Sequence, residues 1–596
     1  ENTGDAYFEG CEVVVKGRFM NQRLAPCPLE VRGAAAVWGT DGRLTQWLST
    51  QHAQGGVDPI AAANGVDRSL VHILTPDVGG GFGAKIGAYP EELLLGVIAK
   101  KIGRAVKWRE TRTESMMALG HGRAQLQYVT IGGTKEGKVT HYQLHAIQDS
   151  GGFADMGTIL APFMTRPMAS GVYAIPNIEC RTTSVVTNTT PIVAYRGAGR
   201  PEATAAIERA MDMFALEIGK DAAEVRRMNL IPKFLEPHTT VVGQTYDVGD
   251  YETALDKALA AADYKALRAE QAKRRASGDA KQLGIGVSVY VEITGGVGNG
   301  ESAKVEVLED GRAVVYTGTS PHGQGHDTAW SMLVQEQTGI PMDRIELVWG
   351  DTDLVPVGTG TMGSRSLQQG GNAVFQVAGT LAEKAKSVAA RLLEVSEADV
   401  VLDKDRGAFH VVGTPAVTKT WADLAVAEKS TGGLLHDEVI NVSGATFPFG
   451  AHIAVVEVDT ETGRVKHLRQ VACDDAGKVL NPMLLDGQIH GGIAQGVAQA
   501  LLEEVLYDAD GNPTTSNLAD YGFISAAELP NVEVIHMETP TPVNAIGAKG
   551  IGESGTIGST PAIQSAVVDA VSHLGVKHIE MPCTAERVWR AIQAAQ

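Results

Sequence analysis

Residues 549–558 read Lys549-Gly550-Ile551-Gly552-Glu553-Ser554-Gly555-Thr556-Ile557-Gly558 and set one carboxylate among four glycines. Glycine has no side chain, so the backbone here can approach a ligand closely and leave room for Glu553 to project toward it. An apolar segment, residues 561–574, follows and predicts a helix behind this loop. On its own, a glycine-bracketed glutamate is more often a solvated loop residue. Four further loops rich in glycine, glutamine or serine lie far apart in the chain and favour a shared binding site instead.

The composition is that of a globular protein large enough for several domains or subdomains. Of the 596 residues, 44% are hydrophobic and 20% are charged, and the formal net charge is −19. A surface this acidic repels nucleic acid and acidic membranes, so the sequence argues against a nucleic-acid partner. An anionic cofactor is compatible with it, because local backbone N–H groups bind anions whatever the global charge.

Five cysteines are scattered along the chain, and none form a Cys-x-x-Cys pair. This spacing argues against a structural zinc site or an all-cysteine iron–sulfur cluster within the chain. Sparse cysteines are typical of a reducing compartment and predict a cytoplasmic location. The sequence has no apolar run long enough to span a bilayer and no signal peptide, and residues 93–99 are expected to form a core helix.

The first half of the chain alternates strands and helices and contains two glycine-rich loops. Strands are predicted at residues 12–19, 34–38, 44–48, 70–74 and 105–109, and helices at residues 59–63, 90–103 and 201–219. Gln51 follows the third strand, and the first glycine loop, residues 79–85, follows the fourth. The second glycine loop, residues 194–202, precedes the last of these helices.

The second half repeats this order. A predicted strand at residues 314–319 is followed by Gln324, a helix at residues 328–337 and a strand at residues 344–349, and a charged segment at residues 251–276, predicted to be one helix, separates the halves. The predicted fold class is therefore α+β, with several mixed-sheet subdomains and helices, in two duplicated halves that enclose a cofactor. The predicted boundaries are a first cofactor-binding domain at residues 1–235, a connecting segment at residues 236–280 and a second cofactor-binding domain at residues 281–596.

Two of the loops also fit a dinucleotide-binding fingerprint. Gly79-x-Gly81-x-x-Ala84 and Gly358-x-Gly360-x-x-Gly363 both have the required spacing. In a true fingerprint the helix begins at the third glycine, whereas here Pro90 places the helix start about six residues after Ala84. The second match follows a proline-containing segment that is poor strand material. These features disfavour a Rossmann domain.

Several distant loops that converge on one large, polar, anionic cofactor explain the pattern better. Gln51, Gln324 and Gln488 offer amide donors and acceptors, and Ser364 and Ser366 offer hydroxyl groups to a phosphate. Each of these residues alone is more often an ordinary loop residue. The whole set in this order favours a common site.

Taken together, these segments resemble the molybdenum-binding large subunit of the xanthine oxidase family. The similarity covers nearly the whole chain in the same order, and is strongest to aerobic carbon monoxide dehydrogenase-like large subunits and to related N-heterocycle and aldehyde dehydrogenases. The segments that carry it are Ser49-Thr50-Gln51, Gly79-Gly80-Gly81-Phe82-Gly83, Ala194-Tyr195-Arg196-Gly197, Gly323-Gln324-Gly325, Gly363-Ser364-Arg365-Ser366, Gly487-Gln488 and Gly552-Glu553.

The resemblance implies a role for each matching position. Glu553 corresponds to the base beside the molybdenum, Gln51 to the glutamine near its apical oxo group, and Arg196 to the arginine on the substrate side. The implied cofactor is molybdopterin cytosine dinucleotide, whose dithiolene holds the molybdenum, so no side chain is expected to ligate the metal directly. The cofactor-binding positions implied in the same way are Gly81, Phe82, Gly83, Arg196, Gly323, Gln324, Gly325, Gly363, Ser364, Arg365, Ser366, Gln488 and Gly552.

The activity implied by the resemblance is that of a molybdenum-dependent hydroxylase or dehydrogenase. Such enzymes insert a water-derived oxygen at an electron-poor carbon of an N-heterocycle or aldehyde, with Glu553 as the general base. A glutamate buried in a glycine-lined pocket is expected to have a raised pKa, which suits that role. The alternatives are oxidation of carbon monoxide, an NAD-dependent dehydrogenase, and a non-catalytic paralogue that scaffolds a complex.

Departures from the family pattern bear on the substrate. Copper-containing carbon monoxide dehydrogenases carry a cysteine directly after the loop arginine, whereas this chain has Gly197, which predicts a site without copper. Purine oxidases carry a glutamate where this chain has Ile86, and Met164 stands near the position of a second purine-binding arginine. Xanthine is therefore disfavoured and a more apolar pocket is expected, in which Tyr195 and Phe163 are candidates to stack on an aromatic ring.

The resemblance also implies partners, because electrons taken from the substrate must leave the chain. A small iron–sulfur subunit and a medium FAD subunit are expected, in a dimer of heterotrimers. The family's large subunit has a further domain before the position of Glu1, so a truncated, split or processed chain is expected.

Overall fold

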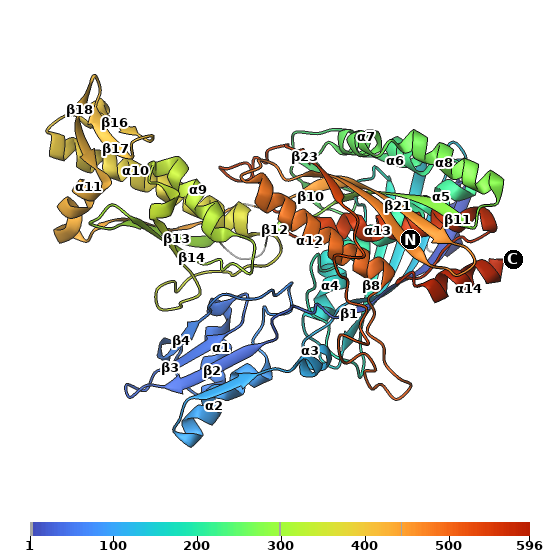
Figure 1. Ribbon diagram of the computed structural model, residues 1–596, viewed down its shortest axis with the longest axis horizontal. Helices are drawn as coiled ribbons and strands as arrows, with labels where there is room; N and C mark the ends of the chain where they lie inside the picture. Colours follow the sequence, from blue (N-terminus) through green and yellow to red (C-terminus); the bar gives the residue numbers. More distant parts are fainter. Residues whose placement is uncertain (1–3, 297–299, 443, 596) are drawn as a thin grey trace.

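The computed structural model describes residues 4–296, 300–442 and 444–595. Each half of the chain contributes one small and one large four-stranded sheet, and the small sheets lie apart from the large ones (Figure 1). Corresponding sheets have the same strand order and the same pairing directions. The predicted duplication of an α+β unit is therefore confirmed at the level of topology.

The two large sheets each have two antiparallel strand pairs followed by one parallel pair. In the first large sheet the spatial order is β1 (Val13–Leu24), β6 (Gly122–Gly133), β7 (Val139–Gly151) and β8 (Asn177–Val186). In the second it is β11 (Lys281–Val291), β21 (Phe449–Asp459), β22 (Val465–Asp475) and β23 (Val532–Met537).

The two small sheets also correspond strand by strand, each with one parallel pair at an edge. The first has the order β4 (Val71–Leu74), β3 (Leu44–Leu48), β2 (Gly33–Trp38) and β5 (Val106–Arg109). The second has the order β15 (Ile345–Val348), β14 (Ala313–Thr317), β13 (Glu301–Val307) and β19 (Leu434–Ile440). The helices that cover them are α1 (Ala53–Asn64) and α2 (Pro90–Ile102) in the first half, and α9 (His326–Thr338) and α10 (Asn372–Leu393) in the second.

The remaining elements connect or extend these sheets. In the first half they are α3 (Arg112–Ala118), α4 (Met156–Leu160) and α6 (Ala222–Asn229). In the second half they are the pair β12 (Thr294–Gly295) and β20 (Ala445–Thr446), the sheet β16 (Val400–Asp403), β17 (Ala408–Val411) and β18 (Thr414–Thr420), and the helices α11 (Trp421–Glu428) and α14 (Ala585–Ala595). Within the described residues, no helix has both the length and the apolar character needed to cross a membrane.

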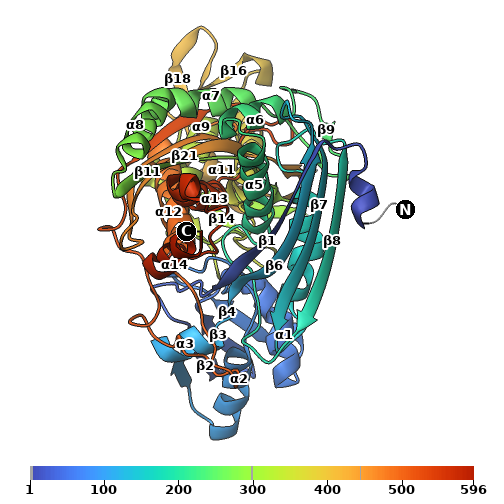
Figure 2. The ribbon, with the colours of Figure 1, turned by 90° about the vertical axis from the view of Figure 1, so that its right-hand side faces the viewer.

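Between the large sheets lie three helices, α5 (Arg200–Glu217), α12 (Pro482–Leu501) and α13 (Ser554–Val571) (Figure 2). Helix α5 packs on β1 and β6, and α13 packs on β11 and β21 as well as on α5 and α12. All residues of α13 except Asp569 are buried. A helix at the centre of the molecule therefore begins directly after Glu553.

The start of α13 corrects the predicted helix at residues 561–574, because Gly555 and Gly558 are helical and not part of a loop. Their role is close packing. A Cβ atom added at Gly555 would lie 2.6 Å from Ile489 O, and one added at Gly286 of β11 would lie 1.9 Å from Ala562 O. The absence of side chains lets α13 approach α12 and the sheet closely, and this tertiary packing outweighs the low helix propensity of glycine.

The connecting segment forms the hairpin β9 (His238–Thr239) and β10 (Thr245–Tyr246) and two helices, α7 (Tyr251–Ala262) and α8 (Tyr264–Ser277). One helix was predicted here, but Asp263 adopts a left-handed conformation, with φ 51°, and ends α7. Helix α7 packs on β21 and β22, and the largest apolar core contains residues of both halves and of α7. The predicted domain boundaries remain a prediction.

Two other helix predictions need correction. Helix α1 begins at Ala53, earlier than the predicted residue 59, and carries Pro59 in its interior. Helix α2 buries Leu95 and Ala99 but leaves Leu94 54% exposed, so it is only partly a core helix.

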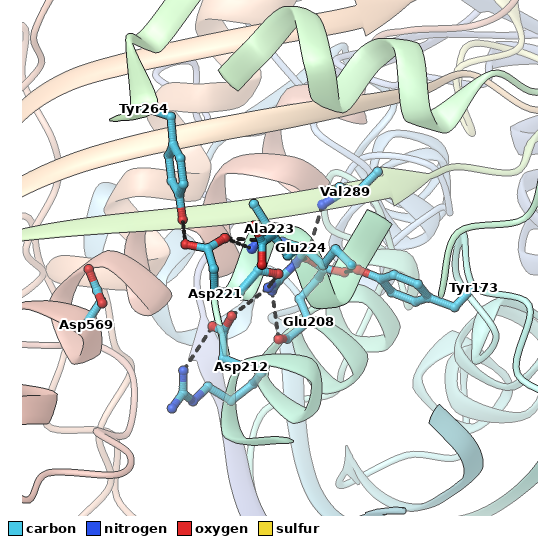
Figure 3. A network of polar contacts seen from close by, with 12 residues as sticks. Tyr173, Glu208, Asp212, Asp221, Ala223, Glu224, Tyr264, Val289 and Asp569 are labelled. Atoms are coloured by element: carbon cyan, nitrogen blue, oxygen red, sulfur yellow. Dashed lines mark hydrogen bonds and ion pairs between the residues drawn. The ribbon is translucent and has the colours of Figure 1, made fainter. Parts of the chain in front are cut away.

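A buried ionic network joins the two halves beside α5 (Figure 3). Glu208 of α5 accepts a hydrogen bond from Arg226 Nε at 2.8 Å and another from Val289 N of β11 at 3.0 Å. Tyr173 donates to the same carboxylate, and Arg226 also pairs with Asp212 at 2.7 Å. The network thus connects first-half helices to a second-half strand through groups that water does not reach.

Candidate active site

The glycine-rich loops of the two halves surround one cavity of about 770 Å³. The edges of the two small sheets also meet, since Thr75 N donates to Gly350 O at 2.7 Å and His72 Nε2 lies 2.8 Å from Asp351 Oδ1. Among the predicted catalytic and cofactor-binding residues, only Gly325 is missing from the wall of this cavity. The predicted residues that form the wall are Gln51, Gly81, Phe82, Gly83, Arg196, Gly323, Gln324, Gly363, Ser364, Arg365, Ser366, Gln488, Gly552 and Glu553.

Gln51 joins the glycine loops of both halves. Its side-chain Oε1 accepts hydrogen bonds from Gly83 N at 2.9 Å and from Lys85 N at 3.2 Å. Its Nε2 donates to Thr361 O at 2.9 Å. The amide therefore fixes the spacing between the first loop and the loop of residues 358–366.

Three glycines of the cavity wall leave space where a side chain would project. A Cβ atom added at Gly323, Gly363 or Gly487 would meet no protein atom within 4 Å. Gly325 differs, because a Cβ atom there would lie 2.7 Å from Leu484 Cδ2. It is the N-cap of α9 and has φ 81°, so packing and backbone conformation explain this glycine, and its proposed contact with a cofactor remains a prediction.

Glu553 is held by three donors from two separate segments. Its Oε1 accepts from Gly197 N at 2.6 Å, and its Oε2 accepts from Arg200 Nη2 at 2.7 Å and from Ser364 Oγ at 2.8 Å. A carboxylate has about four lone-pair sites, so one site on Oε1 is left for a ligand. The side chain is 15% exposed and borders the cavity.

The pKa of Glu553 differs from the expectation. Burial alone raises the pKa, but the Arg200 guanidinium, the Gly197 N–H and the Ser364 hydroxyl hold it below its ordinary value. The predicted raised pKa is therefore wrong for this arrangement. The group is an ionised carboxylate at neutral pH.

A second glutamate, Glu292, lies directly behind Glu553 and was not predicted. It follows β11 and is 0% exposed. Ser364 Oγ lies 3.1 Å from its Oε1, Arg200 Nη2 lies 3.4 Å from the same oxygen, and Ser554 Oγ contacts its Oε2. Burial and the neighbouring charge of Glu553 raise the pKa of Glu292 to about 8.

Arg196 connects the second glycine loop to α12 and to the loop before α13. It donates from Nε to Gly552 O at 2.6 Å, from Nη1 to Gln495 Oε1 at 3.1 Å and from Nη2 to Gln488 O at 3.0 Å. Its backbone N–H donates to Phe82 O at 2.9 Å. These bonds position neighbouring segments, and the predicted role of Arg196 toward a substrate stays a prediction.

The loop of residues 358–366 is fixed from within the second half. Arg365 is 1% exposed, pairs with Glu301 and donates to Gly360 O at 3.0 Å. Ser366 Oγ lies 3.3 Å from Thr361 Oγ1, and Gln324 Oε1 accepts from His322 N. Among the described residues, Gln324 Nε2 has no hydrogen-bond partner, so this amide is free to donate into the cavity that it lines.

One wall of the cavity is apolar and reaches the surface. Leu29 is 76% exposed, Ile159 is 46% exposed and Phe523 is 42% exposed. Tyr195 is buried in the wall, whereas Phe163 is 66% exposed and does not line the cavity. The apolar residues that line this wall are Leu29, Ile86, Met156, Ile159, Leu160, Met164, Phe523 and Ile524.

Sequence reasoning missed Arg200 and Glu292 for different reasons. Arg200 lies in the second glycine loop, immediately before the helix proline Pro201. A role in the site could therefore have been predicted from its position. Glu292 ends a continuous buried strand and gives no local signal, because its partners come from three distant segments. Within the described part of the chain, no three His, Cys, Asp or Glu side chains gather so that they could hold a metal ion.

The chain matches families of molybdopterin cofactor-binding domains over most of its length. Residues 2–230 and residues 257–530 match two molybdopterin cofactor-binding domain families. The carbon monoxide dehydrogenase large chain of Hydrogenophaga pseudoflava is 38% identical over 610 residues, which span 99% of this chain and 76% of that protein. The nicotine 6-hydroxylase large subunit of Paenarthrobacter nicotinovorans is 33% identical over 611 residues, which span 98% of this chain and 74% of that subunit.

Solved structures agree with these sequence matches. The Cu,Mo-CO dehydrogenase in its carbon monoxide reduced state superposes with a TM-score of 0.93 at 35% identity, over 99% of this chain and 77% of that chain. Quinoline 2-oxidoreductase from Pseudomonas putida 86 gives a TM-score of 0.93 at 32% identity, over 99% of this chain and 77% of that chain. The fold and the site thus define a molybdopterin-dependent oxidoreductase. The chain belongs to the molybdenum-binding large subunits of the xanthine oxidase family.

Proposed function

We propose that Glu553 is the general base of a hydroxylation at an electron-poor carbon. The observation that carries this proposal is the ionised carboxylate at the cavity wall, with one lone-pair site on Oε1 free of protein donors. Oε1 is the atom that accepts the proton of the water-derived oxygen as that oxygen bonds to the substrate carbon. Gly197, Arg200 and Ser364 hold the carboxylate in place, so little reorganisation is needed at that moment.

The residues around the cavity fit a molybdopterin. The open positions at Gly323, Gly363 and Gly487 form a cradle that added methyl groups would fill, and the free Nε2 of Gln324 donates toward the same space. When bound, the molybdenum of this cofactor accepts the two electrons of the oxidation. Gln51, Phe82 and Gly83 would lie against its metal end, and Gln324, Ser364, Ser366 and Gln488 against its pterin and nucleotide. We infer the cytosine dinucleotide form from the family resemblance.

We propose a neutral, largely apolar substrate, namely an N-heteroaromatic compound or an aldehyde. The wall formed by Ile86, Met164 and their neighbours is mainly apolar, and Arg200, whose Nη1 lies 3.9 Å from Met164 Sδ, is paired with Glu553. Apolar walls with few polar groups favour uncharged ligands. The names of the nicotine 6-hydroxylase and quinoline 2-oxidoreductase relatives agree with this class.

Oxidation of carbon monoxide is the second candidate, because the carbon monoxide dehydrogenase large chains are 38% and 36% identical to this chain. Gly197 stands where the copper-binding cysteine of that group is expected, and its N–H is committed to Glu553. Cys27 also lines the cavity, and burial raises the pKa of its thiol to about 11, but it does not stand at the position directly after the loop arginine. We therefore propose a site without copper.

We propose that electrons leave through a small iron–sulfur subunit and a medium FAD subunit, in a dimer of heterotrimers in the cytoplasm. The names of relatives, such as large chain and subunit gamma of a dehydrogenase complex, support a multi-subunit enzyme. The five cysteines are all free thiols, which fits a reducing compartment.

Glu553→Gln tests the assignment of the base. We expect the variant to fold and keep its cofactor, and to lose turnover by roughly 100-fold or more. The measurement is kcat on a panel of N-heterocycles and aldehydes, normalised to molybdenum content. Glu252→Gln, at a side chain that is 62% exposed, serves as the matched control. Normal turnover by a loaded Glu553→Gln enzyme would rule out this role.

A further inference from the structure

Glu292 and Glu553 face the same two donors. Ser364 Oγ lies 2.8 Å from Glu553 Oε2 and 3.1 Å from Glu292 Oε1. Arg200 Nη2 lies 2.7 Å and 3.4 Å from the same two oxygens. One hydroxyl and one nitrogen therefore bridge the buried carboxyl group of Glu292 and the carboxyl group of Glu553 at the cavity wall.

The hydrogen atoms in this arrangement can be counted. A serine hydroxyl donates one hydrogen and accepts at its lone pairs. If Ser364 donates to the nearer oxygen, on Glu553, then Glu292 Oε1 faces a lone pair of Ser364 Oγ. That contact is repulsive for an ionised carboxylate and favourable for a protonated one, which can donate to Ser364.

The charges lead to the same conclusion. Glu292 is 0% exposed, and Arg200 is the one cation bonded to it among the described residues, through the nitrogen that also binds Glu553. Two ionised carboxylates with one shared cation would leave an uncompensated buried charge, which is costly. Neighbouring carboxyl groups share a single proton in other buried pairs.

Other titratable groups near Glu292 do not supply a second positive charge that could compensate an ionised Glu292. Arg196 lies in the same region but donates to Gly552, Gln488 and Gln495. On the side of β11, Tyr290 Oη donates to Asp474 at 2.7 Å, and Asp474 also contacts His452 Nε2 at 3.0 Å. The Ser554 hydroxyl contacts Glu292 Oε2 from α13.

We propose that Glu292 is a positioning residue that holds the single proton of a Glu292–Glu553 pair. With the proton on Glu292, the Ser364 hydrogen and the Arg200 charge are both directed to Glu553, which stays ionised and aligned. This inference rests on the proposed role of Glu553 as the base. It adds a second carboxyl group, that of Glu292, which keeps Glu553 ionised and aligned.

The pair predicts an alkaline limit to activity. As the pH rises through about 8, Glu292 loses its proton and competes for Ser364 and Arg200. Glu553 then loses its alignment, so kcat falls. A glutamine at this position imitates the protonated form, so Glu292→Gln should keep kcat at pH 7 within about threefold of wild type and lose the alkaline decline.

The test combines kinetics with infrared spectroscopy on the purified holoenzyme complex. At pH 7, the wild-type minus Glu292→Gln difference should contain the C=O band of one protonated carboxyl group, lost with a midpoint near pH 8. The difference excludes Glu503, whose pKa burial also raises to about 8, because both proteins contain it. Glu553→Gln should move the Glu292 midpoint to lower pH, since the neighbouring charge is gone.

Two further variants complete the test. Ser554→Ala removes a hydrogen bond that lowers the pKa of Glu292, so the alkaline decline should move to higher pH. Glu92→Gln, at a buried carboxyl group outside this network, should leave the decline in place. An alkaline decline that persists unchanged in Glu292→Gln would overturn the proposal, as would a difference spectrum without the carboxyl band at pH 7. Full turnover by Glu553→Gln would instead refute the proposed base, while the infrared difference would still decide whether Glu292 holds a proton.

Discussion

At the residue scale, Glu553 is kept ionised and aligned for proton transfer by its hydrogen-bond donors, and its pKa is not raised. Gly197, Arg200 and Ser364 stabilise the charged form, and together they outweigh the effect of burial. A base with a lowered pKa is ionised over the whole physiological pH range. Its strength must come from alignment and from exclusion of water.

Replacing Arg200 should therefore shift the acid side of the pH profile. Arg200 lowers the pKa of Glu553, so in Arg200→Met this pKa rises and the base becomes protonated at a higher pH. The acid decline of kcat/KM should move upward by about one pH unit or more. The pH dependence of kcat/KM measures this, with molybdenum content checked in each variant.

Arg200→Lys provides the matched comparison, because it keeps a cation beside Glu553. Its acid decline should stay closer to that of wild type, even if kcat falls through loss of the guanidinium geometry. An unshifted acid decline in Arg200→Met would show that Arg200 does not set the ionisation of the base.

At the scale of elements, small residues place α12 and α13 close together beside the cavity. Gly492 on α12 faces Gly555 on α13, where an added Cβ atom would lie 3.0 Å from Gly555 Cα. Glycine has a different use at Gly487, which lies on the same helix but faces open space in the cavity wall. The same residue type thus serves packing at one position and ligand access at another.

Gly487→Ala should separate folding from cofactor binding. Alanine in a helix interior stabilises by about 0.5–1 kcal/mol relative to glycine, so the unfolding temperature should stay equal or rise. The new methyl group occupies the cradle, so cofactor binding should weaken by about 1–3 kcal/mol. Molybdenum per chain and thermal unfolding are measured together.

Gly379→Ala in α10 is the control, since its nearest contact is the flexible end of Gln337 at 3.2 Å. It should gain similar stability and keep its molybdenum. Full molybdenum content in Gly487→Ala would place the cofactor elsewhere in the cavity.

Features that repeat along the chain could be predicted from the sequence. Features that depend on contacts between distant segments could not. Gln51 and Gln324 follow equivalent strands, so the duplication of the small sheets was predictable from residue order. The start of α13 was not, because Gly555 has low helix propensity and only its packing on α12 explains a helix there. The pKa of Glu553 was predicted wrongly for a similar reason, since Arg200 and Gly197 lie far from it in the chain.

At the scale of the whole molecule, the two halves share one core and one ionic network. Glu208 and Arg226 belong to the first half, and Val289 belongs to a strand of the second half (Figure 3). The cavity lies between the halves, so their relative placement determines its geometry. The cavity can therefore keep its geometry only if the contact between the two halves is stable.

Removing one partner of this network should be costly. Glu208→Ala leaves Arg226 buried with less compensation and should destabilise the protein by about 3–5 kcal/mol. Glu346→Ala removes a partner of an exposed ion pair and should cost less than about 1 kcal/mol. Thermal unfolding of both variants checks the difference, and equal stability would show that the buried network does not hold the halves together.

We propose that this chain is the molybdopterin subunit of a copper-free hydroxylase. The most direct measurement is elemental analysis of the purified complex for molybdenum, copper and iron, with identification of the nucleotide released from the pterin. We expect about one molybdenum per chain, no stoichiometric copper, iron from a partner subunit, and cytidine monophosphate. Copper present together with molybdenum would restore oxidation of carbon monoxide, and a matured complex without molybdenum or pterin would contradict the account.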